Sequence, residues 1–480
     1  MLSIGAMSGD QAGYYLSLAR EDYYLNGGEP PGRWYGRGSR ELNLTGLVQA
    51  DELHNLFAGF APDGSHSLVQ RQRKSEAATH RPGWDLTFSA PKSVSVLWAT
   101  GDQELRSAIE RAHREPEQAA TAYSEKEADA TRRGQNGKVS EKVSMVAACF
   151  DHSTSRALDP QLHTHALLLN VGVRADGTTG TVSAYQVFQC KMLAGALYRA
   201  ELANQLIEGP KLSIERDRFA FKVKGVPDEA VDFYSKRREE MQAEMKRKGL
   251  SSAKAAAMVA IQTRDTKTQV SRPELFEQWK QECDGLGWNQ SRAESLVGSH
   301  QPVRDHQSLV AHAQRSALDE LMDNVAHFTR RDYLQGLAVT LQPLGVSASE
   351  VVRLGTTFLN RSKEVVPLGP IDDIERYTTA SMFESEKRLL EHAEALHGNS
   401  HHKLVGRHVE DVDFAVLVEV AEAARQRVRQ GVTRAEVGRS LTIVRDDGAG
   451  GSQALVEGTC PRPCQSAEPI YLPSRAAELG

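Results

Sequence analysis

Two apolar runs near the middle of the chain constrain its fold most strongly. Residues 143–150 and 162–173 are rich in aliphatic side chains, and a polar stretch containing Asp159-Pro160 separates them. Runs of this length on either side of a turn are typical of neighbouring antiparallel strands. Residues 85–90 alternate polar and apolar side chains with the period of a half-buried strand. The pattern predicts an antiparallel sheet, and the helical periodicity around it predicts a mixed α/β fold.

Three histidines lie on these runs or at their ends. His163 and His165 stand two residues apart, so on a strand they share one face with Cα atoms about 6.5–7 Å apart. His152 follows Phe150 at even spacing, so a continued strand would bring its ring beside the pair. Three imidazoles with open coordination positions are typical of a catalytic metal site. The alternative is that the histidines only occupy the polar face of a sheet.

Two pairs of adjacent tyrosines precede a glycine-rich loop near the N-terminus. They are Tyr14-Tyr15 and Tyr23-Tyr24, in a chain with only 12 tyrosines. A phenolate can attack phosphorus and form a covalent intermediate. Because an unperturbed phenol has a pKa of about 10, it needs a nearby base or cation, and Asp85 is a candidate base. The pairs could instead be buried aromatic surface, and Asp85 an ordinary surface carboxylate.

The charge of the chain does not decide whether it binds nucleic acid. Its 58 Lys and Arg against 63 Asp and Glu give a net charge of -5, but residues 1–300 hold 38 basic and 38 acidic side chains. A local phosphate-binding groove is therefore compatible with the sequence. Five scattered cysteines argue against a disulfide framework. No apolar stretch approaches the roughly 18–20 residues that span a bilayer, so we expect a cytoplasmic protein without membrane insertion.

Several motifs together resemble the MobF-type conjugative relaxases, the TrwC/TraI-like members of the HUH endonucleases. The resemblance covers about residues 1–300 and rests on the paired tyrosines, on residues 81–95 (RPGWDLTFSAPKSVS), and on residues 152–156 followed by 160–166. It implies an HUH relaxase-like α/β fold of the two-layer α+β type. In such a fold an antiparallel-sheet palm is flanked by helices, and here a helical C-terminal extension would follow.

The resemblance implies a site- and strand-specific DNA relaxase that nicks single-stranded DNA at a plasmid transfer origin for conjugative transfer. A tyrosine transesterification would leave a 5′-phosphotyrosine intermediate. Tyr14 would be the initiating nucleophile and Tyr23 the second, with Tyr15 and Tyr24 as catalytic neighbours. Asp85 would accept the phenolic proton.

The same resemblance implies a divalent metal and a DNA partner. The expected metal ligands are His152, His163 and His165. Relatives are associated with Mg or Mn, although imidazole ligands also suit Zn or Ni. The candidate DNA-binding residues, which flank the motifs, are Arg81, Lys92 and Arg156. Single-stranded DNA at the transfer origin would be the partner, and relaxosome accessory proteins and a coupling protein could join it.

The last part of the chain carries a weaker signal. Residues 301–395 are expected to be helical and could be a winged-helix-like remnant of a helicase entry region, followed by a partly helical and then loose tail over 396–480. No Walker A loop is present, so ATP-driven unwinding is not expected. Two alternatives stay open: a non-catalytic origin-DNA-binding remnant of a truncated relaxase-helicase, and a three-His metalloenzyme on a small substrate with a snug apolar pocket.

Overall fold

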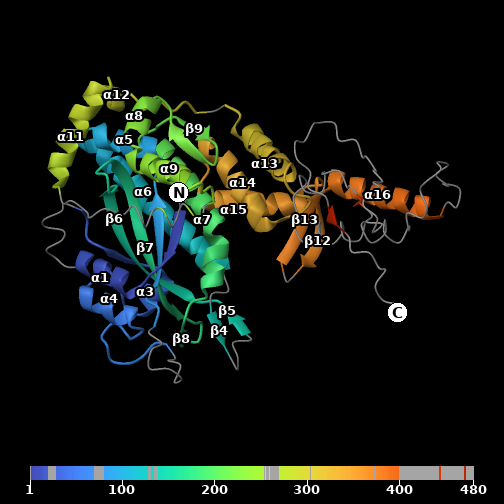
Figure 1. The fold of residues 1–480 in the computed structure, drawn as a ribbon, viewed down its shortest axis with the longest axis horizontal. Coiled ribbons are helices and arrows are strands. Elements are labelled where there is room, and N and C mark those ends of the chain that lie inside the picture. Colours follow the sequence, from blue (N-terminus) through green and yellow to red (C-terminus); the bar gives the residue numbers. More distant parts are fainter. Residues whose placement is uncertain are drawn as a thin grey trace, which may run out of the picture. The chain divides into compact units, whose positions relative to one another are not determined.

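A six-stranded antiparallel sheet forms the centre of the first part of the chain (Figure 1). The strands pair in the order β1-β3-β7-β6-β2, and β8 extends the end of β7. Their bounds are β1 Leu2–Ala6, β2 Arg33–Tyr35, β3 Gly83–Ser89, β6 Ser144–Thr154, β7 Pro160–Val173 and β8 Thr179–Gly180. The computed structural model describes residues 2–19, 29–69, 80–127, 131–133, 139–252, 255, 259, 270–302, 304–371, 374–398, 443–444 and 470–471.

Helices cover both faces of this sheet. On one face α5 (Lys92–Thr100), α6 (Gln103–Glu127) and α7 (Ala184–Glu208) bury the side chains of Leu86 and Phe88. On the other face lie α1 (Gly9–Leu18) and α4 (Ala50–Phe57), and α3 (Arg37–Glu41) follows the edge strand β2 and contacts β6. Since side chains alternate along a strand, Asp85 and Thr87 point away from the core that holds Leu86. The predicted mixed α/β fold with an antiparallel sheet is confirmed.

Helix α5 is buried because it lies between the sheet and α11 (Arg272–Gly285). The Trp98 ring packs against Phe276 and Trp279 of α11, with centroid separations of 4.9 and 5.8 Å. Trp279 also donates its Nε1–H to the carbonyl of Leu158 at 2.9 Å. Leu158 lies in the turn between β6 and β7, so α11 holds the connection between the two strands that carry the histidines.

The remaining elements before residue 300 extend this unit. They are β4 Thr131–Arg133, β5 Val139–Glu141, β9 Ile214–Asp217, β10 Ala220–Val223, α8 Asp228–Phe233, α9 Lys236–Arg247 and α12 Gln290–Glu294. None of the helices in the described part of the chain is long and apolar enough to cross a membrane.

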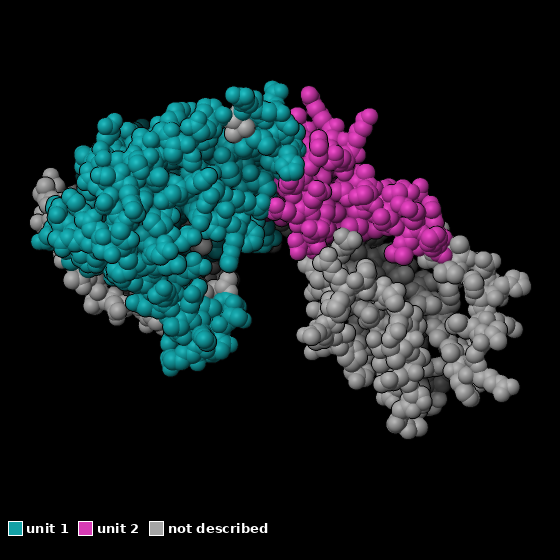
Figure 2. All heavy atoms as spheres, turned by 90° about the horizontal axis from the view of Figure 1, so that it is seen from above, with its two compact units in different colours: residues 1–314, 334–354 teal, residues 315–333, 355–480 magenta. Residues whose placement is uncertain are grey.

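The chain divides into two compact units, residues 1–314 with 334–354, and residues 315–333 with 355–480 (Figure 2). The later elements are α13 His306–Met322, β11 Phe328–Thr329, α14 Arg330–Thr340, α15 Ala348–Arg361, β12 Val365–Ile371, β13 Ile374–Thr379 and α16 Ala380–Gly398. The second unit has its own three-stranded sheet in the order β11-β13-β12. Its aromatic rings Phe328 and Tyr377 stack at 5.9 Å. Of the tail predicted over 396–480, only residues 396–398, 443–444 and 470–471 are among the described residues.

His113 on α6 is buried behind the sheet, with 3% of its surface exposed. Its pKa is lowered from 6.5 to about 4, and burial is the largest cause. The Asp151 carboxylate raises the pKa and Arg33 lowers it, but both effects are smaller than that of burial. The ring contacts the hydroxyls of Tyr198 at 2.9 Å and Thr164 at 3.2 Å. It is therefore neutral in the folded protein at pH 7.

This buried histidine predicts a pH dependence of stability. Between pH 6.5 and about 4 the unfolded chain binds a proton at His113 that the folded chain does not. The free energy of unfolding should therefore fall as the pH is lowered through this window, by up to about 1.4 kcal/mol per pH unit from this group. Urea unfolding of the wild type and of His113→Gln in chelator-treated buffer at several pH values checks it. Parallel pH profiles for the two proteins would contradict the assignment.

Candidate active site

The three predicted metal ligands converge on one face of the sheet. His152 on β6 lies directly opposite His163 on β7, and His165 follows two residues along the same face. The three ring centroids are 5.1 to 5.3 Å apart. One nitrogen from each ring lies within 4.8 Å of the others. This spacing lets a single divalent ion reach all three imidazoles.

Hydrogen bonds fix which ring nitrogen each of two histidines offers. His163 Nδ1 lies 2.8 Å from the carbonyl of Gln161, and His165 Nδ1 lies 2.9 Å from both oxygens of Asp85. Since carbonyls and carboxylates only accept, both Nδ1 atoms carry a proton, which leaves Nε2 as the nitrogen that each ring can offer to a metal. Burial lowers the pKa of His163 to about 3, aided by His165. His163 is therefore in the neutral form that binds metals.

Asp85 on β3 connects the histidines to a tyrosine. It accepts hydrogen bonds from the Tyr15 hydroxyl at 2.6 Å and from the Thr87 hydroxyl at 3.2 Å, besides that from His165. Burial raises its pKa, but the attraction of His165 and the hydrogen bonds from His165, Tyr15 and Thr87 together lower the pKa below its usual value. Asp85 is therefore an ionised carboxylate between the imidazole centre and helix α1.

The two tyrosines of the first pair differ in environment. Tyr15 is 5% exposed and bonded to Asp85, whereas Tyr14 is 40% exposed. Their rings meet edge to face at 5.2 Å. Neighbours on a helix point about 100° apart, so only one member of the pair can face Asp85. The phenol that meets the predicted base is thus Tyr15, and Tyr14 faces the exterior.

The other predicted residues are more dispersed. Tyr23 and Tyr24 lie outside the described residues. Arg81 and Arg156 are exposed. Lys92 is half-buried and donates a hydrogen bond to the carbonyl of Pro160 at 3.1 Å. Burial lowers the pKa of Lys92 to about 8, and the smaller effect of the Asp159 carboxylate opposes this change.

Two residues at the site escaped the sequence analysis. Thr87 donates to Asp85, and the backbone of Gln161 orients His163. Thr87 could have been found, because it lies two residues from Asp85 on the same strand face. The Gln161 contact uses a carbonyl, which every residue type has, so no side-chain pattern could reveal it.

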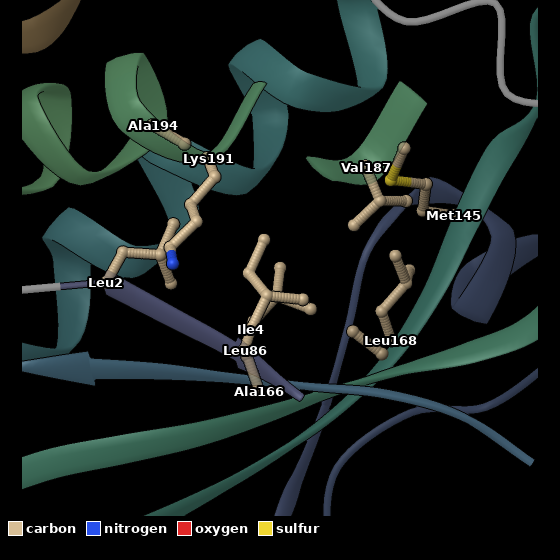
Figure 3. Close-up of a pocket in the computed structure, with 10 residues that line it drawn as sticks. Leu2, Ile4, Leu86, Met145, Ala166, Leu168, Val187, Lys191 and Ala194 are labelled. Atoms are coloured by element: carbon tan, nitrogen blue, oxygen red, sulfur yellow. The ribbon is translucent and has the colours of Figure 1, made fainter. Parts of the chain in front are cut away.

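A small cavity lies on the opposite face of the sheet (Figure 3). Apolar side chains from β1, β3, β6, β7 and α7 line it, including Ile4, Leu86, Leu168 and Val187. Its volume is about 20 Å³, far below the several hundred Å³ that a small-molecule site takes up. Leu86 follows Asp85 on β3, and Leu168 lies three residues beyond His165 on β7, so both leucines point to the sheet face opposite the histidines. The cavity is therefore separate from the imidazole centre.

Comparison with known proteins places these features in a family. A family model described as TrwC relaxase matches residues 8–286. The multifunctional conjugation protein TraI of Escherichia coli is 31% identical over 391 residues, and its counterpart from strain K12 is 30% identical over 394. These alignments cover 76% and 77% of this chain but 21% of each relative. The chain therefore spans about a fifth of the length of the TraI relatives.

Solved structures agree with this match. Conjugative relaxase TrwC in complex with OriT DNA, in a metal-free structure, is 29% identical with a TM-score of 0.53. The metal-bound structure of the same complex is 30% identical with a TM-score of 0.52. Each covers 60% of this chain and 99% of the TrwC chain. The fold is that of these relaxase structures, and the three-histidine cluster is consistent with a metal site. The chain belongs to the TrwC relaxase family.

Proposed function

We propose that this protein is a site- and strand-specific DNA relaxase that nicks single-stranded DNA at a plasmid transfer origin. The observation that carries the proposal is the meeting of a tyrosine-bearing helix, an ionised Asp85 and three imidazoles at one site. The relatives support the DNA partner, since TrwC is described in complex with OriT DNA. Relaxosome accessory proteins and a coupling protein would be further partners in conjugative transfer, in the cytoplasm.

The reaction exchanges one phosphodiester for another. The phenolic oxygen forms a bond to the scissile phosphorus, the bond from phosphorus to the 3′-oxygen breaks, and the phenolic proton balances the departing 3′-hydroxyl. The strand stays attached as a 5′-phosphotyrosine. No ATP is needed, because a free 3′-hydroxyl can later attack the same linkage and restore the strand.

The two tyrosines of the first pair take different parts in this proposal. Tyr14, which is accessible, is the initiating nucleophile, and Tyr23 is the second. Tyr15 is the buried neighbour whose hydroxyl holds Asp85. We propose that Asp85 accepts the Tyr14 proton once Tyr14 turns toward it from its exposed position; Asp85 is ionised, but its lowered pKa makes it a weak base. Proton transfer should therefore accompany attack on phosphorus rather than precede it.

The histidines fit a divalent ion, because three imidazoles that each offer one nitrogen are suitable ligands and leave positions open for a phosphate. The ion would be held by His152, His163 and His165. When bound it supplies positive charge that polarises the scissile phosphate. Mg or Mn is proposed from the family, with Zn or Ni as alternatives that imidazole ligands favour.

The DNA would contact basic side chains around this centre. Arg81 and Arg156 are exposed and are the better candidates. Lys92 already donates a hydrogen bond to the Pro160 carbonyl, so we propose that it attracts DNA by its positive charge and does not contact it directly.

Residues 1–300 would be the relaxase domain. For residues 301–395 we propose a winged-helix-like extension, supported by the order α13, β11, α14, α15, β12, β13.

A covalent-adduct assay tests the proposal. The protein should form a denaturation-resistant adduct with a single-stranded oligonucleotide that spans its cognate origin, in the presence of Mn²⁺ or Mg²⁺. Removal of metal with EDTA should suppress the adduct, because the ion supplies several kcal/mol of charge stabilisation. Readdition of Mn²⁺ should restore it, and denaturing electrophoresis measures the yield.

Other outcomes of this assay favour the alternatives. Tight binding of the origin oligonucleotide without adduct, with metal bound, would indicate a non-catalytic DNA-binding remnant. Metal binding without any affinity for origin DNA would indicate a metalloenzyme acting on a small substrate.

A further inference from the structure

A chain of polar side chains, buried except for the half-buried Asp151, lies on the sheet face opposite the histidines. Asp151 precedes His152 on β6, and Thr164 stands between His163 and His165 on β7. Because side chains alternate along a strand, both point away from the imidazole centre. Asp151 and Thr164 are opposite each other in the register, directly beside the pair His152 and His163.

The hydrogen bonds of this chain run in a single direction. The Thr164 hydroxyl is 2.7 Å from Asp151 Oδ1 and 3.2 Å from His113 Nε2. An ionised carboxylate only accepts, so Thr164 donates to Asp151 and must accept from His113 Nε2–H. In the neutral ring Nδ1 then accepts from the Tyr198 hydroxyl, 2.9 Å away. In this chain the Tyr198 hydroxyl therefore donates to His113, and the Thr164 hydroxyl donates to Asp151.

Helices and a neighbouring strand hold both ends of the chain. Tyr198 lies on α7 and His113 on α6. At the other end, Asp151 Oδ2 accepts from the Arg33 guanidinium of β2 at 2.7 Å and from Arg114 of α6 at 3.3 Å. Thr164 is 0% exposed and Tyr198 is 0% exposed. A buried network with all its members paired restricts the positions that they can take.

We propose that Thr164 is a positioning residue for the metal centre. Its hydroxyl is bonded to β6 on one side and to α6 on the other, and together with the backbone pairing of β7 to β3 and β6 it restrains the twist of β7 at residues 163–165. A change in that twist would move His163 and His165 together relative to His152. The proposal rests on the proposed metal centre, and it assigns the Tyr198–His113–Thr164–Asp151 chain to holding the three imidazoles in one geometry.

The test compares three single substitutions in the full chain. Thr164→Val keeps the shape of the side chain but removes the hydroxyl, and Thr164→Ser keeps the hydroxyl. Thr100→Val is the matched control, because Thr100 is also buried and its hydroxyl bonds the Val96 carbonyl and Trp288 Nε1, away from the histidine strands. Calorimetry measures Mn²⁺ affinity, and the electron paramagnetic resonance spectrum of bound Cu²⁺ reports ligand geometry.

Thr164→Val should weaken Mn²⁺ binding by about tenfold or more, as loss of groups that orient metal ligands usually does, and should change the Cu²⁺ spectrum. The Thr164→Ser protein should keep the wild-type Mn²⁺ affinity and the wild-type Cu²⁺ spectrum. Thr100→Val should lose thermal stability but keep wild-type affinity and spectrum. If Thr164→Val does not fold, Tyr198→Phe removes the donor to His113 without changing the core shape, and a shifted Cu²⁺ spectrum is expected from it.

Two results would overturn the proposal in different ways. A Thr164→Val protein with reduced stability but with wild-type affinity and spectrum would show that the chain has only a structural role, while the proposed function would stand. A wild-type protein that binds neither Mn²⁺ nor Cu²⁺ would remove the metal centre and the positioning role together.

Discussion

A Tyr14→Phe variant is expected to form covalent adduct with an origin oligonucleotide only at a small residual rate. The substitution removes only the attacking oxygen. Because Tyr14 is 40% exposed, we expect little change in the stability of the fold. Loss of a nucleophile typically lowers the rate by roughly a thousandfold or more. Initial rates of adduct formation with excess oligonucleotide measure the effect. The double variant Tyr14→Phe and Tyr23→Phe removes any residual adduct at the second tyrosine.

Tyr15→Phe is the matched control for this experiment. Its ring is buried, and the substitution removes one hydrogen bond to the charged Asp85, worth about 1.5–3 kcal/mol. We expect a slower adduct rate, by roughly 10- to 100-fold, but a detectable product. The opposite ranking, with Tyr15→Phe inactive and Tyr14→Phe active, would make Tyr15 the nucleophile, consistent with its contact to Asp85.

His163→Ala should lose the metal and with it the nicking activity. The substitution leaves two imidazoles, which is too few to hold the ion as firmly as three. Since a catalytic ion contributes several kcal/mol to the transition state, the adduct rate should fall by about 100-fold or more. Mn²⁺ titration by calorimetry and the adduct assay should show parallel losses.

His66→Ala is a suitable control for that variant. His66 is exposed and its ring contacts the nearby Ser65 hydroxyl, away from the three ligands. It should bind Mn²⁺ and form adduct like the wild type. A His163→Ala protein that keeps wild-type Mn²⁺ affinity would contradict the assignment of the three-histidine centre.

The sequence predicted the histidine cluster because strand periodicity is local. Apolar runs over 143–150 and 162–173 correspond to β6 (Ser144–Thr154) and β7 (Pro160–Val173). Within such strands the period of two decides which side chains share a face. His152 lies within β6, so the expected continuation of the first run is confirmed by the structure. The positions of the three histidines along two strands therefore sufficed to predict that their rings would cluster.

The tyrosine geometry could not be predicted in the same way. Tyr14 and Tyr15 are adjacent on a helix, and which of them turns toward Asp85 depends on how α1 packs on the sheet. The polar chain behind the site escaped prediction for a related reason, because His113 and Thr164 are far apart in sequence. Such contacts between distant residues leave no periodic signal.

The pairing of β6 with β7 has a consequence for how the centre assembles during folding. His152 and His163 meet across one short turn, whereas Asp85 and His165 are separated by 80 residues of sequence. Closing a longer loop costs more chain entropy, and contacts between distant residues slow folding. Two of the three clustered histidines can thus come together within a local hairpin, while the carboxylate joins them only after β3 has docked along the edge of β7.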